Sequence, residues 1–202
     1  MTAVLRTEWR KSTTTRTWWL LAGAMFGYML VMGVIMAASF ALAMREPANQ
    51  EMVVAARDAA SSVYTLAVAL GYIFPAVLGA LVVTTEFRHR TITPTLLAEP
   101  RRSLVLGGKL VAVIPFAVVL AVVGVLGTVL GGAAALAVLD EPTFLGDAAM
   151  QRTIALSVVA LILWALVGVG FGSVLTNQVA AIVVLLVFTQ FVEPLLRLLL
   201  AQ

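Results

Sequence analysis

Cysteine is absent from this chain of 202 residues, and histidine occurs once, at His89. Without cysteine the chain has no disulfide and no thiolate metal site. A single histidine also leaves the usual hydrolase and zinc sites incomplete, because they need further catalytic or ligating partners. The sequence GGK at Gly107–Lys109 lacks the spacing of a phosphate-binding loop. We therefore expect no enzyme activity, no metal and no cofactor in this chain.

Charged residues are scarce as well, at 11% of the chain against 62% hydrophobic residues. The mean hydropathy of +1.06 exceeds what a soluble protein of this size accommodates in its core. Four windows contain no Asp, Glu, Lys, Arg or His: 17–44, 59–85, 110–139 and 153–192. Each window exceeds the roughly 20 residues that cross a bilayer as a helix. The composition therefore predicts an all-α integral membrane protein.

The fourth window holds enough residues for two crossings. Ser173, Thr176, Asn177 and Gln178 lie in its middle and supply groups for a turn and a helix cap. We therefore predict five spans in a single transmembrane domain, 1–202. The spans are placed at about 18–43, 62–85, 108–138, 153–173 and 178–199. Pro75 is expected to kink the second of them.

Positive charge distinguishes the two sides of the membrane, because loops rich in lysine and arginine stay in the cytoplasm. Nine bases fall in the N-terminal segment and in the loop after the second span: Arg6, Arg10, Lys11, Arg16, Arg88, Arg90, Arg101, Arg102 and Lys109. Both segments are therefore predicted to be cytoplasmic, and residues 1–17 to form an interfacial helix. Eleven arginines against two lysines fit a GC-rich bacterial genome. We expect a multi-pass protein of a bacterial plasma membrane.

The charge-free windows also bear on transport. A carrier driven by a proton or sodium gradient usually has an ionisable residue within the bilayer. The four windows contain none, which weakens the hypothesis that this chain is a secondary carrier. Aromatic and polar side chains of the second and fifth spans are candidates for a substrate pathway: Tyr72, Phe74, Phe188 and Gln190. Ordinary helix packing is the alternative for each of them.

The loop sequence TTEFRHRTITPTLLAEPRR, at 84–102, places two acids, four arginines and the single histidine between two apolar runs. Thr93 is predicted to cap a short helix that has Pro94 at its first position and ends at Pro100. Leu96 and Leu97 at its centre, with arginines around them, are typical of an apolar anchor with a charged rim. The alternative is a positively charged loop whose leucines touch lipid headgroups.

The same loop follows the pattern E-x-x-x-x-T-x-x-x-x-L-L-x-x-P-x-R. Its residues are Glu86, Thr91, Leu96, Leu97, Pro100 and Arg102, with Lys109 opening the next span. This pattern, the N-terminal sequence TEWRK and the layout of the spans resemble the permease subunits of ABC-2 type transporters. Arg90 stands where that family commonly has glycine, so we expect a helical turn there. The family usually has six spans, so a sixth is expected beyond Gln202.

The resemblance implies a half-transporter that pairs with a second copy or a homologue. Its first cytoplasmic loop would be a coupling helix docked on a separate ATP-hydrolysing subunit, which binds ATP and Mg. Carried over by position, the partner-binding residues would be Glu86, Arg88, Arg90, Thr91, Leu96, Leu97, Pro100 and Arg102. Glu86 is expected to pair with a loop arginine.

The function expected from this resemblance is export of an amphipathic or apolar molecule, with membrane lipid but no nucleic acid among the partners. Two alternatives stay open. One is a non-catalytic membrane scaffold or assembly subunit, and the weaker one is a channel or secondary carrier.

Overall fold

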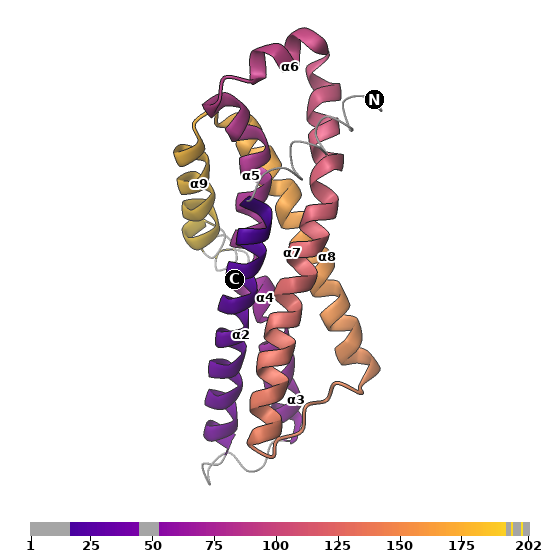
Figure 1. Cartoon of the computed structure of the whole chain (residues 1–202). Coiled ribbons are helices and arrows are strands. Elements are labelled where there is room, and N and C mark those ends of the chain that lie inside the picture. The colour runs from indigo at the N-terminus through magenta and orange to yellow at the C-terminus, as the bar shows by residue number, and fades with distance from the viewer. Residues whose placement is uncertain (1–16, 45–52, 193–194, 196–198, 200–202) are drawn as a thin grey trace. The chain divides into compact units, whose positions relative to one another are not determined.

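The computed structural model describes residues 17–44, 53–192, 195 and 199, and their regular structure is entirely helical (Figure 1). Three of these helices are long and apolar enough to cross a membrane: α2 (Thr17–Met44), α7 (Arg102–Val138) and α8 (Ala148–Val174). They coincide with the first, third and fourth predicted spans and identify a helical membrane protein. The interfacial segment expected at 1–17 lies, except for Thr17, outside the described residues.

The second predicted span is not the single helix expected at 62–85. The chain forms α3 (Val53–Tyr64), α4 (Leu66–Ala69) and α5 (Ile73–Arg88), with turns at Thr65 and at 70–72. The Gly71 carbonyl accepts from the Phe74 amide at 3.1 Å, because the residue that would complete a regular helical bond is Pro75, which has no N–H. The kink expected at Pro75 is therefore a break just before it. Pro75 becomes the third residue of α5, where an amide hydrogen has no partner within the helix.

The break predicted inside the fourth charge-free window is confirmed. Helix α8 ends at Val174 and α9 (Gln178–Val187) begins after Asn177, whose side-chain oxygen accepts from the amides of Val179 and Ala180 at 2.9 and 3.3 Å. A π-helical turn, η2 (Phe188–Val192), continues α9. The rest of the fifth predicted span, 178–199, lies outside the described residues except for residues 195 and 199.

The described residues belong to two compact units. The first, the α2 unit, comprises Thr17–Phe74 and Val118–Ile162. The Tyr64 side chain is fully buried there in a cluster that includes Val63 and Met150, and its hydroxyl donates to the Thr143 carbonyl at 2.8 Å. Glycines bring α2 and α7 together: a Cβ at Gly33 would lie 2.8 Å from the Thr128 carbonyl oxygen.

The second, the α6 unit, includes Pro75–Ala117 and the described residues from Leu163 onward. Small residues join α5 and α8 in this unit. A Cβ at Gly172 would lie 2.7 Å from the Ala80 carbonyl oxygen, and Cβ atoms at Gly168 and Gly79 would collide with the backbones of Ala76 and Ala165. We call these contacts the glycine seam. Such close approach requires residues without large side chains, and it fixes the helix that carries the loop described next.

Candidate functional site

The candidate site is the segment from Glu86 to Lys109, which leaves α5, forms the short helix α6 (Ile92–Ala98) and enters α7. Helix α5 ends with paired backbone bonds: the Thr91 amide donates to the Glu86 carbonyl at 2.9 Å, and the Arg90 amide to the Phe87 carbonyl at 3.2 Å. This bond pattern is a Schellman cap. It requires a left-handed residue, and Arg90 supplies it with a φ of 56°. The helical turn expected at Arg90 is therefore wrong, because the residue keeps the left-handed backbone that favours glycine.

One prediction follows from this backbone. Replacing Arg90 with glycine should stabilise the fold by about 1 kcal/mol, because glycine adopts the left-handed region without the steric cost of a Cβ. Thermal unfolding of the purified full chain checks this, with Arg88→Gly as the control. Arg88→Gly removes the same charge. Because Arg88 lies in helical backbone at the end of α5, glycine there should destabilise the fold. Equal losses of stability in both variants would contradict the argument.

Helix α6 begins two residues earlier than its sequence predicts. Its N-cap is Thr91, not Thr93, and Pro94 occupies the third helical position instead of the first. The Thr91 hydroxyl makes no cap bond to α6 and instead lies 3.4 Å from the Glu86 carbonyl oxygen, on the α5 side of the turn. The end at Ala98 agrees with the prediction, since Glu99 is extended, as a residue before proline prefers.

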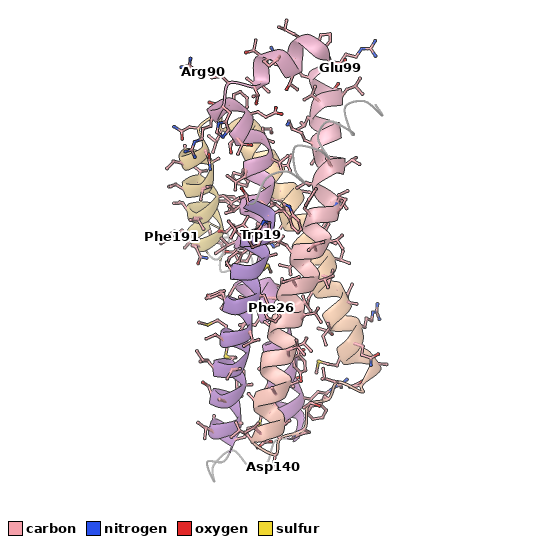
Figure 2. The ribbon with its side chains drawn as sticks, in the orientation of Figure 1. Trp19, Phe26, Arg90, Glu99, Asp140 and Phe191 are labelled. Atoms are coloured by element: carbon pink, nitrogen blue, oxygen red, sulfur yellow. The ribbon has the colours of Figure 1, made fainter. Side chains whose placement is uncertain are left out.

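The two leucines of α6 differ in exposure. Leu97 is 81% exposed, whereas Leu96 is partly buried. In Figure 2, Arg90 and Glu99 mark the two ends of this short helix. An apolar side chain so exposed next to charged neighbours is the kind of anchor that fills a pocket on a partner surface.

The surface around α6 is basic. Exposed cationic side chains flank the helix on both sides: Arg88, Arg90, Arg101 and Arg102. Arg88 also donates to the side-chain oxygen of Gln178 at 3.1 Å, which ties the end of α5 to the start of α9. Of the two acids in the loop, Glu99 accepts from the Arg101 amide at 3.3 Å, and Glu86 is buried.

Glu86 forms a buried ion pair with Lys109, the residue that opens the third predicted span. The Lys109 Nζ lies 2.9 Å from the Glu86 Oε1, and the two side chains are 2% and 5% exposed. Lys109 Nζ also donates to the Val82 carbonyl at 3.4 Å, one helical turn before Glu86. Within the described ranges Glu86 thus pairs with a lysine of α7, and not with the loop arginine that the sequence suggested. Lys109 was visible as part of the sequence pattern, but nothing local marked it as a partner of Glu86.

The four candidate pathway residues do not form one site within either unit. Tyr72 and Phe74 belong to the α2 unit, and Phe188 and Gln190 to the α6 unit. The Phe74 ring lies 6.1 Å from the Tyr28 ring, and the Phe188 ring 5.5 Å from the Phe171 ring. These contacts are ordinary aromatic packing inside each unit. A pathway role for the four residues stays a prediction.

No group of three or more acidic or histidine side chains that could hold a metal occurs within the described ranges. Comparisons of the chain with protein-family models, with curated proteins and with solved structures found no match. The class that the fold defines is therefore that of an α-helical membrane protein with a basic, leucine-tipped loop between α5 and α7.

Proposed function

We propose that this chain is the membrane-spanning permease subunit of a bacterial ABC-2 type exporter. The observation that carries the proposal is α6, a short helix that presents an 81% exposed leucine within a rim of arginines. In this proposal α6 is the coupling helix, and it docks on a separate subunit that binds ATP and Mg and hydrolyses the nucleotide.

The energetics of α6 support a partner. A helix of seven residues is not stable alone in water, and here the Schellman cap on one side and α7 on the other hold it. Burial of a leucine side chain stabilises a protein or a complex by roughly 1.5–3 kcal/mol. Leu97 is exposed, so its side chain does not contribute this stabilisation in the isolated chain. Burial of Leu97 in a groove of a partner would stabilise the complex by this amount, and the surrounding arginines would then face carboxylates at the rim of that groove.

The remaining parts of the proposal rest on the sequence. The charge distribution supports a cytoplasmic α6. The charge-free windows support a multi-pass protein with five spans, which we place in a bacterial plasma membrane. The lack of ionisable residues in the charge-free windows supports an energy source outside this chain. The substrate is proposed to be amphipathic or apolar, and the assembly to contain a second copy of this subunit or a homologue.

Purification tests the proposal directly. The full chain is tagged, expressed from its native operon and purified in mild detergent, and the proteins bound at stoichiometric amounts are identified by mass spectrometry. We expect an ATP-hydrolysing subunit, together with ATPase activity of the reconstituted complex. Purification of the chain with a stoichiometric partner that binds no nucleotide would favour the scaffold alternative. Purification without any partner would contradict docking.

A further inference from the structure

A buried ion pair is an unusual means of joining two apolar helices. Removing a carboxylate and an ammonium group from water is costly, and a hydrophobic pair of similar volume usually stabilises a fold as well or better. Glu86 and Lys109 are nevertheless almost fully buried, in contact at 2.9 Å. Stability alone does not account for such a pair, which points to a role in fixing a particular arrangement.

The pair lies where the two ends of the loop meet. Glu86 is on α5, before the loop, and Lys109 is on α7, after it. The Lys109 ammonium contacts α5 at two successive turns, through the Val82 carbonyl and the Glu86 carboxylate. This double contact fixes the register of α7 against α5, because a shift by one turn would break both interactions.

The backbone of Glu86 holds the loop at the same time. Its carbonyl accepts from the Thr91 amide at 2.9 Å, and Thr91 is the N-cap of α6. One residue therefore connects α7, through its side chain, with the start of α6, through its backbone. A displacement of α6 that reaches Glu86 through this bond therefore acts on the Schellman cap and on the ion pair.

We propose that Glu86 and Lys109 form a clamp that positions α6 and makes it move as one body with the ends of α5 and α7. Lys109 is thereby a positioning residue of the loop. Through the clamp, a displacement of α6 would be passed on to the membrane helices. This use of the clamp rests on the docking role of α6 proposed above. The order that it imposes on the loop does not depend on any partner.

Trypsin tests the clamp, because the loop carries its own cleavage sites at Arg90, Arg101 and Arg102. The full chain is reconstituted alone in lipid nanodiscs, and the fragments cut at these arginines are followed by mass spectrometry. Cleavage tracks the population of the opened loop when opening is fast. We expect Lys109→Met to be cut there at least about tenfold faster than wild type, since it removes the ammonium group that contacts the buried Glu86 carboxylate at 2.9 Å. The control Arg152→Met removes an exposed cation of the α2 unit and should keep the wild-type rate.

A double variant separates positioning from plain stability. Glu86→Gln with Lys109→Met removes both charges of the buried pair together, so its thermal unfolding should stay near that of wild type. If the clamp positions the loop, this variant is still cut at Arg90, Arg101 and Arg102 several times faster than wild type. A wild-type cleavage rate in the double variant would overturn the proposal, as would a wild-type rate in Lys109→Met. Because no partner is present, either result leaves the docking proposal to be judged by purification alone.

Discussion

Changing Leu96 and Leu97 together to aspartate should release the ATP-hydrolysing subunit that we propose as the partner of α6. The exposed Leu97 side chain is the proposed anchor, and a carboxylate in its place would enter a groove that excludes water. Loss of an anchor residue weakens an interface by about 2 kcal/mol or more, which corresponds to roughly a thirtyfold higher Kd. Pull-down of the partner by the tagged chain, followed by titration in nanodiscs, measures the change.

Two controls make this result specific. Leu97→Ala removes the apolar contact without adding charge and should weaken binding by less than the double change. Ser103→Asp adds a single carboxylate at an exposed position of α7 outside α6, and should retain the partner. Equal pull-down by the wild type and by the double aspartate variant would show that α6 is not the docking site. If Ser103→Asp lost the partner as fully as the double aspartate variant, the positive charge around α6 would determine partner binding, and not the two leucines.

The second large effect is expected at the glycine seam. Gly168→Ala places a methyl group against the backbone of Ala76, which has no side chain that can rotate away. Helices α5 and α8 must then separate, and overpacking of this kind costs about 1–3 kcal/mol. Thermal unfolding of the full chain in detergent should therefore show a lower unfolding temperature for Gly168→Ala than for the wild type.

The same helix offers a matched control. Gly170 is exposed, and a Cβ there would meet nothing within 4 Å. Gly170→Ala should therefore leave the unfolding temperature unchanged or raise it slightly, since alanine favours helix over glycine. Gly79→Ala, on the opposite side of the seam, should behave like Gly168→Ala. A similar response at Gly168 and Gly170 would mean that helix propensity decides the stability here, and not the approach of the two backbones.

Local chemistry explains what the sequence predicted well. The break before α9 was predictable because Asn177 bonds to amides two and three residues ahead, which is a property of the segment itself. The end of α6 was predictable for the same reason, since Pro100 restricts Glu99. The three long apolar helices follow from uninterrupted hydrophobic sequence, which has few alternatives in a membrane.

Interactions between distant segments explain what the sequence did not predict. The pairing of Glu86 with Lys109 depends on how the loop returns α7 to α5, which no local pattern encodes. Arg90 was recognised as a departure from glycine, but its backbone follows from the Schellman bonds and not from its side chain. The break at 70–72 has a local cause instead, because Pro75 has no N–H and the helix restarts early enough to place the proline in its first turn.

The glycine seam also bears on the proposed export, because it restricts where two helices can separate. A gap between two helices commonly opens when side chains change rotamer, but at Gly168 and Gly79 the contact is made by main-chain atoms. Between α5 and α8 a passage would require the two helices to move apart as wholes and lose the entire contact. For the export proposed above, a bulky apolar molecule would therefore have to pass somewhere other than between α5 and α8 at the glycine seam.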